Sequence, residues 1–288
     1  DNEDYKVMLQ DKSHALTLQQ LTSQAVYVVK NLVKNMQVTK FRPYMLEASF
    51  GAKYPNFHKL KGMQINNGYR DLSFEGVIDR IDKFEDRAII IDYKSKYNIE
   101  FTPSNILYGD RIQLFVYLNA LRQNCDITPQ GVFYLLMNNR FVRSGSKSGK
   151  RFMHRGFVNS DEEFLDDLDG GFEQGSSYAS DVYPIKRKVS KDGEVEYSAQ
   201  ENGEILDSQD FDGVCDYVMR LATKSAREIE EGYIAKSPLN IGGEEDVKAC
   251  RYCNYSGVCS RSKVKTRNVK MVNMQEFTSI MGVDKCQR

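Results

Sequence analysis

Two acidic residues and one lysine lie in two neighbouring segments whose composition is typical of β-strands. Asp79 belongs to the segment 73–84, while Asp92 and Lys94 belong to the segment 87–94. Both segments are rich in β-branched residues, and a short acidic turn joins them, which predicts a β-hairpin. Residues two apart on a strand emerge on the same face. Asp92 and Lys94 therefore share a face, and Asp79 on the partner strand can lie beside them.

These three side chains suit the hydrolysis of phosphodiester bonds. Carboxylate oxygens are the ligands that Mg²⁺ and Mn²⁺ prefer. Such an ion lowers the pKa of water and stabilises charge on phosphorus oxygens, while a nearby lysine holds the water nucleophile or steadies the phosphate. The sequence predicts a catalytic centre at Asp79, Asp92 and Lys94. The alternative is an exposed hairpin with surface ion pairs, but the apolar run 89–91 delivers Asp92 from a buried strand.

Gln113 and Tyr117 add polar groups on one face of a predicted amphipathic helix, because they are four residues apart. A Gln amide and a Tyr hydroxyl can hydrogen-bond a substrate backbone or orient a carboxylate. The pair is therefore a candidate for substrate positioning. The alternative is a purely structural pair.

The remaining patterns supply the elements that must position these residues. In chain order, we expect a helix over 16–36, a strand over 44–50, the hairpin, a helix over 105–123 and a strand over 129–137. This order predicts an α/β domain with a mixed sheet flanked by helices. Further along we expect a basic loop over 140–155, an acidic helix over 161–169, a loop or small hairpin over 174–204 and a second long helix over 210–233.

Three regions follow from this organisation. Residues 1–138 form the predicted nuclease core, residues 139–208 a basic loop and insertion, and residues 209–288 a C-terminal helix with a cysteine segment and a basic tail. Lysines and arginines of the basic loop and of the tail, residues 261–270, are candidates for phosphate contacts. The alternative is that both stretches are solvated loops.

Three motifs in series resemble the RecB-type branch of the PD-(D/E)xK nucleases. They are GVIDRID at 76–82, IIDYKS at 90–95 and QLFVY at 113–117. The resemblance implies a restriction-endonuclease-like fold, with Asp79 and Asp92 as metal ligands and Lys94 as the catalytic lysine. It also implies that the Tyr93 carbonyl is a further ligand, and that Gln113 and Tyr117 form the family's third motif.

Two more segments are similar to the nuclease domains of AddB-type helicase–nuclease subunits. They are RPYMLEASFG at 42–51 and GYIAKSP at 232–238, and the likeness extends over about residues 16–265. It implies a Mg²⁺- or Mn²⁺-dependent deoxyribonuclease, of exonuclease type, that serves double-strand break repair. Single-stranded DNA and a helicase subunit, or a helicase-like region upstream, are the implied partners. Glu47 is either an acid near the metal or part of a structural ion pair.

Cys250, Cys253 and Cys259 place three thiolates in a short segment, and thiolates select zinc or iron–sulfur clusters. In AddB-like proteins, such cysteines join a distant upstream cysteine around a [4Fe–4S] cluster. This sequence has no cysteine before Cys125, so we expect an incomplete cluster here. The alternatives are a substitute thiolate from elsewhere in the chain, a zinc site, or three reduced cysteines without metal.

The early metal-binding histidine of RecB-type nucleases also lacks a clear counterpart, because neither His14 nor His58 fits its place. One explanation covers both gaps: we expect the natural protein to continue upstream. The chain has no G-x-x-x-x-G-K-[ST] motif, so unwinding would come from elsewhere.

Composition limits the remaining choices. Lysine and arginine together number 40, as do aspartate and glutamate, so the formal net charge is zero and gives no support for nucleic-acid binding. No run of 18 apolar residues and no signal peptide is present, so we expect a cytoplasmic protein. Three rivals remain: an inactive nuclease-like domain that binds DNA or a partner, a standalone RecB-like exonuclease, and a structural zinc module.

Overall fold

The structure is a computed structural model that describes residues 12–51, 59–66, 71–95, 99–137, 153–243, 248–251, 253–259 and 265–286. Most of the predicted basic loop, namely residues 140–152, lies outside these ranges. Part of the predicted basic tail, residues 261–264, also lies outside them, as does His58.

A seven-stranded sheet forms the centre of the described chain, in the order β12-β8-β7-β6-β5-β1-β2. β5 pairs antiparallel with β1 and β6, whereas β6 pairs parallel with β7, so the sheet is mixed. The strands are β1 (Arg42–Phe50), β2 (Lys59–Leu60), β5 (Gly76–Phe84), β6 (Arg87–Lys94), β7 (Thr128–Leu136), β8 (Arg155–Asn159) and β12 (Gly203–Leu206). The predicted α/β class with a mixed sheet flanked by helices is confirmed.

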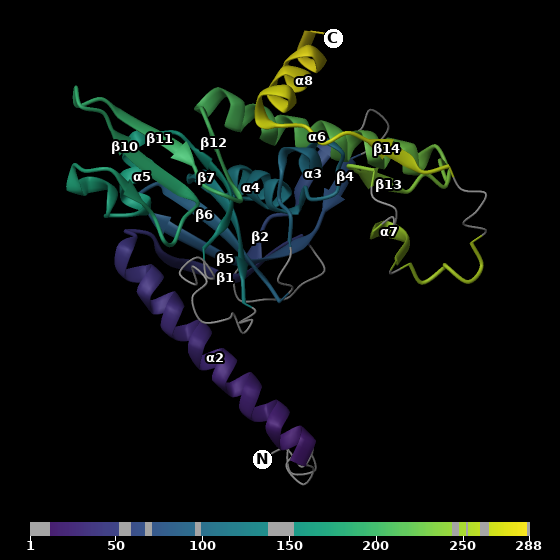
Figure 1. The fold of residues 1–288 in the computed structure, drawn as a ribbon. Coiled ribbons are helices and arrows are strands. Elements are labelled where there is room, and N and C mark those ends of the chain that lie inside the picture. The colour runs from purple at the N-terminus through teal and green to yellow at the C-terminus, as the bar shows by residue number, and fades with distance from the viewer. Residues whose placement is uncertain are drawn as a thin grey trace.

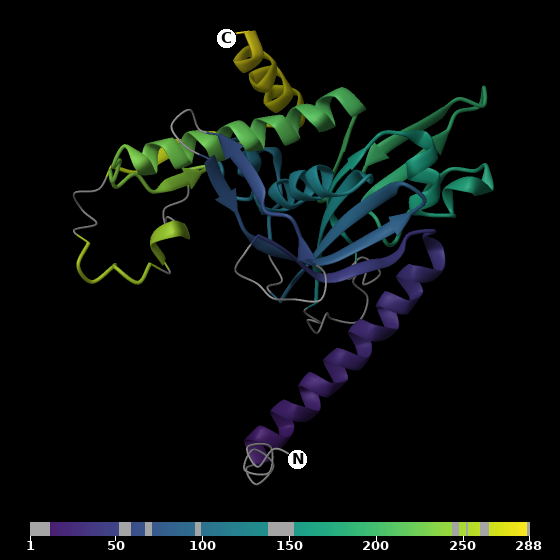
Figure 2. The same cartoon turned by 180° about the vertical axis from the view of Figure 1, so that it is seen from behind.

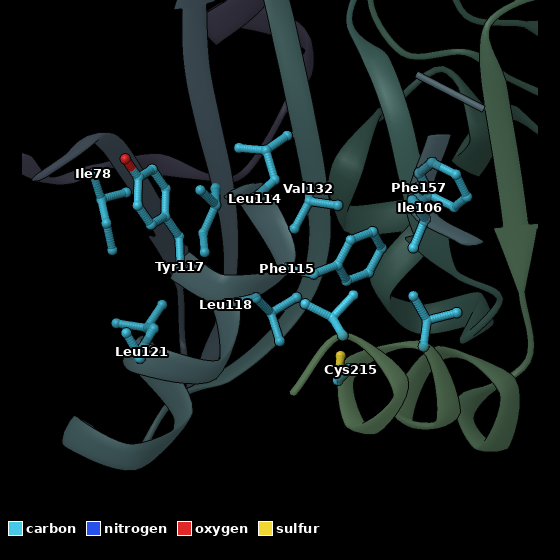
Figure 3. Close-up of a cluster of buried hydrophobic side chains, with 14 of the residues drawn as sticks. Ile78, Ile106, Leu114, Phe115, Tyr117, Leu118, Leu121, Val132, Phe157 and Cys215 are labelled. Carbon is cyan, nitrogen blue, oxygen red and sulfur yellow. The ribbon is translucent and has the colours of Figure 1, made fainter. Parts of the chain in front are cut away.

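One face of this sheet, here called the helical face, is covered by α3, α4 and α6, and α8 packs on α3 and α6 from outside (Figure 1). α4 contributes most of the contact, because Leu114, Phe115 and Leu118 are fully buried. Figure 3 shows them beside Val132 of β7 and Cys215 of α6. Burial of each such apolar side chain stabilises the fold by about 1.5–3 kcal/mol. The four helices are α3 (Pro103–Leu107), α4 (Gln113–Asn124), α6 (Ser208–Glu230) and α8 (Met274–Cys286).

The opposite face buries a second apolar cluster. Ile89 and Ile91 of β6 point into it, while Ala88 and Ile90 belong to the helical face, as strand alternation requires. Its covering elements are α5 (Glu162–Leu168), η2 (Phe172–Gln174), the three-stranded sheet of β9 (Tyr178–Ala179), β10 (Ile185–Val189) and β11 (Val195–Ala199), and the C-terminal part of α2 (Lys12–Val38).

The N-terminal part of α2 extends away from the body of the molecule (Figures 1 and 2). Nearer its C-terminus, the helix is attached by the buried Val28 and by Gln24, whose Nε2 donates to the Met137 carbonyl at 2.9 Å. The Met137 N–H donates in turn to the Lys94 carbonyl at 2.8 Å. α2 is therefore connected to the end of β6.

Smaller elements complete the described chain. They are β3 (Met63–Asn66) with β4 (Asp71–Phe74), β13 (Leu239–Ile241) with β14 (Arg267–Val269), and α7 (Lys248–Arg251). Among the helices of the described ranges, none has the length and apolar character needed to span a membrane.

The helix predicted over 105–123 is in fact two helices, and this prediction was wrong in one respect. α3 ends at Leu107 and α4 begins at Gln113. Gly109 adopts φ +81°, and the Asn105 carbonyl accepts hydrogen bonds from the N–H groups of Asp110 and Arg111. The apolar spacing continues through this turn, so periodicity alone did not reveal it.

His154 gives the fold a testable pH dependence. Its ring is buried against Phe133 and Tyr183, and its Nδ1 lies 3.1 Å from the Val182 carbonyl. Burial lowers the pKa of His154 from 6.5 to about 4. The fold therefore favours the neutral form of His154. Its contribution to the free energy of unfolding is fully present above pH 6.5 and is lost as the pH falls towards 4. We expect protonation of His154 to lower the free energy of unfolding by about 3 kcal/mol over that pH range.

Urea denaturation from pH 7.5 to pH 4.5 measures this loss, with His154→Gln for comparison. Carboxylates titrate in both proteins, so their contribution cancels in the difference. The free energy of unfolding should fall more steeply for the parent than for the variant. Parallel curves would contradict the assignment of the dependence to His154.

Candidate active site

The β5–β6 hairpin brings the two predicted acidic ligands together. Its last ladder pair is Arg80 with Ile91, and continuing that register by one residue sets Asp79 opposite Asp92. The Asp79 carboxylate accepts a hydrogen bond from the Tyr93 N–H at 2.9 Å. The side chain of Asp79 thus replaces a backbone partner and holds the end of the ladder closed.

Asp92 is a buried carboxylate at the end of an apolar strand. Its side chain is 4% exposed, and Lys94 Nζ forms an ion pair with its Oδ2. Burial raises the pKa of Asp92, the Lys94 ammonium counteracts this rise, and the negative charge of Asp79 adds to it. Asp79 and Asp92 are therefore close enough to repel each other, which a shared cation would relieve.

Tyr134 lies beside this acidic pair, on the neighbouring strand β7. It lies next to Asp92 in the parallel ladder between β6 and β7, and its side chain is almost completely buried. Lys94 Nζ lies 5.2 Å from the centre of its ring, a distance at which the aromatic face attracts a cation. Lys94 is thus held between the Asp92 carboxylate and the Tyr134 ring.

A buried ion pair supports the hairpin from the opposite face. Arg80 Nε and Nη2 each lie 2.5 Å from an oxygen of Asp82, and both side chains are less than 10% exposed. Arg80 Nη1 also donates to the Tyr93 hydroxyl at 3.1 Å. Tyr93 is therefore held at both ends, by Asp79 through its N–H and by Arg80 through its hydroxyl.

Glu47 of β1 lies opposite Asp79 of β5, because its neighbours Leu46 and Ala48 pair with Arg80 and Ile78. Its backbone has φ +49°, a left-handed conformation that costs a residue other than glycine about 1–2 kcal/mol. Its side chain is exposed, and no ion pair joins it to another residue in the described ranges. Both predicted roles of Glu47, an acid near the metal and a member of a structural ion pair, stay predictions.

Gln113 and Tyr117 contact each other on the first turns of α4. Gln113 Nε2 donates to the Tyr117 hydroxyl at 2.7 Å. The Tyr117 ring packs edge-on against Phe50, and it lies so near Gly76 that a Cβ there would be 3.1 Å from it. α4 thus places this pair near the start of β5, three residues before Asp79.

The acidic pair has features that fit a divalent cation. Oδ2 of Asp92 is buried, and among the described residues Lys94 is its ionic partner, so this single cation faces the two carboxylates of Asp79 and Asp92. Within the ranges that the structure describes, no three His, Cys, Asp or Glu side chains gather at metal-binding distances. The acids present are thus two, and further ligands would be backbone oxygens, substrate oxygens or water.

Arg111 is a residue that the sequence analysis missed. Its positive charge acts on the Tyr134 hydroxyl, as does the negative charge of Asp92. The Asp110 carboxylate, 3.5 Å from Arg111 Nε, acts on the same hydroxyl with the opposite charge, so this ion pair of the turn between α3 and α4 acts on Tyr134 as a whole. Its position two residues before Gln113 was the one available signal.

The three C-terminal cysteines are all reduced. Cys250 lies in α7, and Cys253 and Cys259 lie in the turns that follow it, where the Cys253 N–H approaches the Cys250 carbonyl at 3.3 Å. Cys253 is exposed, and the other two are partly buried. In the part of the chain that the structure describes, these side chains do not converge into a metal-binding group.

Comparison with known proteins gives a consistent result. The family model described as the PD-(D/E)XK nuclease superfamily matches residues 5–260. The B-type subunit of an ATP-dependent helicase/deoxyribonuclease from Caldanaerobacter subterraneus subsp. tengcongensis is 29% identical over 262 residues, covering 84% of this chain and 21% of that protein. A protein of the same name from Clostridioides difficile is 27% identical over 292 residues, covering 94% of this chain and 24% of that protein.

The buried pair behind the hairpin yields a prediction about stability. Arg80→Met leaves the Asp82 carboxylate buried without its partner, so we expect the free energy of unfolding to fall by about 3–5 kcal/mol. Arg122→Met is the matched control, because Arg122 pairs at 2.6 Å with the exposed Asp212. That change should cost less than about 1 kcal/mol. If urea denaturation gives equal losses for the two variants, the buried pair contributes no more to the free energy of unfolding than the exposed pair, and the prediction is wrong.

Proposed function

The chain belongs to the PD-(D/E)XK nuclease superfamily, and we propose that it is the metal-dependent DNA nuclease part of a helicase–nuclease for double-strand break repair. PD-(D/E)XK nucleases use divalent metal ions. The observation that carries the proposal is the acidic pair at the end of a buried strand, with Lys94 beside it. Asp79 and Asp92 would hold Mg²⁺ or Mn²⁺, together with the Tyr93 carbonyl.

The residues of the site divide the work of hydrolysis. When bound, the metal lowers the pKa of water and stabilises negative charge on the phosphate. Lys94 orients the attacking water or steadies the phosphate, and its ion pair with Asp92 keeps the ammonium in place. Gln113 and Tyr117 position the substrate strand, and Glu47, opposite Asp79 in the register of β1 and β5, would act near the same metal.

The partner and the substrate follow from the relatives. Their name joins a helicase to a deoxyribonuclease, and this chain spans only 21% and 24% of their lengths. A helicase produces single strands, so an associated nuclease meets unwound DNA. We infer that the chain cleaves single-stranded DNA from an end and acts beside a helicase, and that the work takes place in the cytoplasm.

Asp92→Ala should abolish cleavage and leave the fold intact. The charge is buried and faces a site rather than the apolar core, so its loss removes a metal ligand without opening a large cavity. Release of nucleotides from a labelled single strand in Mg²⁺ measures the activity, and thermal melting checks the fold. We expect a loss of at least about 1,000-fold, the scale of a group that acts directly in the transition state.

Mn²⁺ titration separates this proposal from an inactive domain that only binds DNA or a partner. The parent should melt at a higher temperature in Mn²⁺, because the ion binds the folded state alone, and Asp92→Ala should lose this shift. Asp110→Ala is the control, since Asp110 is a half-exposed acid outside the proposed ligand set. Full activity in Asp92→Ala, or a metal-stabilised parent that cleaves no DNA, would refute the nuclease assignment.

The cysteine segment supports a second cofactor in the same proposal. Cys250, Cys253 and Cys259 would supply three thiolates to a [4Fe–4S] cluster, which takes a fourth ligand besides them. Thiolates are deprotonated when they bind metal, which links assembly to folding.

Anaerobic reconstitution with iron, sulfide and a small thiol as the fourth ligand tests this cofactor. The parent should turn brown and retain iron through gel filtration, whereas Cys253→Ser should stay colourless. Cys125→Ser is the control, because Cys125 lies at the end of α4, outside the cysteine segment. A parent that retains zinc and no iron would instead support a structural zinc module.

A further inference from the structure

The end of β6 that carries the acidic pair is held on its β5 side by side chains. The ladder between β5 and β6 ends at the pair Arg80 and Ile91, whereas β6 stays paired with β7 as far as Lys94. Beyond the last β5 pair, the Tyr93 N–H donates to the Asp79 carboxylate at 2.9 Å. The position of the Tyr93 backbone on this side therefore depends on side-chain contacts rather than on a continued ladder.

Arg80 makes a second contact with Tyr93 on the opposite face of the sheet. Arg80 lies opposite Ile91, so Tyr93, two residues further along, is its diagonal neighbour on the same face. Arg80 Nη1 donates to the Tyr93 hydroxyl at 3.1 Å. The Tyr93 side chain is thus restrained at both ends, by the strand at its Cα and by the guanidinium at its hydroxyl.

The Asp82 carboxylate fixes the guanidinium that makes this contact. Arg80 Nε and Nη2 each lie 2.5 Å from an oxygen of Asp82, and both side chains are buried. Two parallel hydrogen bonds of this kind set the plane of a guanidinium as well as its position. Nη1 is the remaining nitrogen, and it is the one that reaches the Tyr93 hydroxyl. The Arg80–Asp82 pair is therefore a rigid anchor for the Tyr93 side chain.

We propose that Arg80, acting through the Tyr93 hydroxyl, positions the Tyr93 backbone for the binding of the divalent cation. The proposal rests on the nuclease function proposed above, in which Asp79 and the Tyr93 carbonyl are metal ligands. Residue 93 serves both, because its N–H holds the Asp79 carboxylate and its carbonyl is itself a ligand. Arg80 and the Tyr93 hydroxyl are positioning groups, since they lie on the opposite face from Asp92. Groups that orient metal ligands typically change metal affinity about 10–100-fold when they are removed.

The affinity for Mn²⁺ tests this role without cleavage. Electron paramagnetic resonance measures free Mn²⁺ during a titration of the protein, at a temperature where every variant is folded. Tyr93→Phe removes the hydroxyl and keeps the ring, and it should raise the dissociation constant about tenfold. Arg80→Lys keeps a cation beside Asp82 without the planar fork, and it should have a similar effect. The double variant should bind no more weakly than the weaker single variant, because both changes break the same contact.

Tyr197→Phe is the matched control for a change that only lowers stability. The Tyr197 hydroxyl donates to the Asp166 carboxylate, and Tyr197 belongs to β11, outside the seven-stranded sheet. Each Tyr→Phe change removes one hydroxyl hydrogen bond to a charged group, so both should lower the melting temperature. Tyr197→Phe should nevertheless bind Mn²⁺ as the parent does. The proposal is overturned if Tyr93→Phe binds Mn²⁺ as tightly as Tyr197→Phe, or if the effects of Arg80→Lys and Tyr93→Phe multiply in the double variant.

Amide hydrogen exchange tests the same contact in the absence of metal. The N–H of residue 93 should exchange with deuterium several-fold faster in Tyr93→Phe than in the parent, because a less restrained backbone releases the Asp79 carboxylate more often. Nuclear magnetic resonance of the labelled protein measures this rate. Equal exchange rates at residue 93 would overturn the proposal, since the hydroxyl would then have no influence on the backbone.

These measurements separate the positioning role from the nuclease function. A parent that binds Mn²⁺ and cleaves DNA, with a Tyr93→Phe variant that binds Mn²⁺ equally well, leaves the nuclease assignment intact and overturns the role of Arg80. A parent that binds no Mn²⁺ and cleaves no DNA refutes the nuclease function, and the positioning role is refuted with it.

Discussion

A carboxylate buried at the end of an apolar strand is the feature on which the site depends. Withdrawing a charge from water is costly unless a partner compensates for it. Asp92 obtains that compensation from Lys94 alone among the described side chains, while Asp79 acts against it. The pair is therefore short of positive charge. A divalent cation would supply this charge, and the sheet presents both carboxylates before any ion arrives.

Strand alternation gives the hairpin two sides with separate tasks. Asp92 emerges on the helical face, where Tyr134 and the start of α4 lie, while the Tyr93 ring emerges on the opposite face and meets Arg80. The Arg80–Asp82 pair thus stiffens the strand from behind without entering the site. An ion pair on the opposite face of the strand supports the residues of the site and keeps their side chains in a fixed geometry.

Much of this arrangement was predictable from period and spacing. Alternation in the segment 87–94 was enough to place Asp92 and Lys94 on one face, and the family match confirms the resemblance that the three motifs indicated. Features set by tertiary contacts were not predictable. The break between α3 and α4 depends on a buried Asn105, whose carbonyl accepts two backbone hydrogen bonds in the turn, and the left-handed backbone of Glu47 interrupts a strand of otherwise regular pairing. None of these leaves a periodic signal in the chain.

The attachment of α2 gives the fold a mechanical property. A helix of 27 residues is about 40 Å long, and much of it stands clear of the body. Gln24 binds the Met137 carbonyl, and the Met137 N–H binds the carbonyl of Lys94. Two hydrogen bonds in series therefore join the middle of α2 to the backbone that carries Lys94. The projecting half of the helix thus begins at the residue that is hydrogen-bonded, through Met137, to the end of the strand of Asp92 and Lys94.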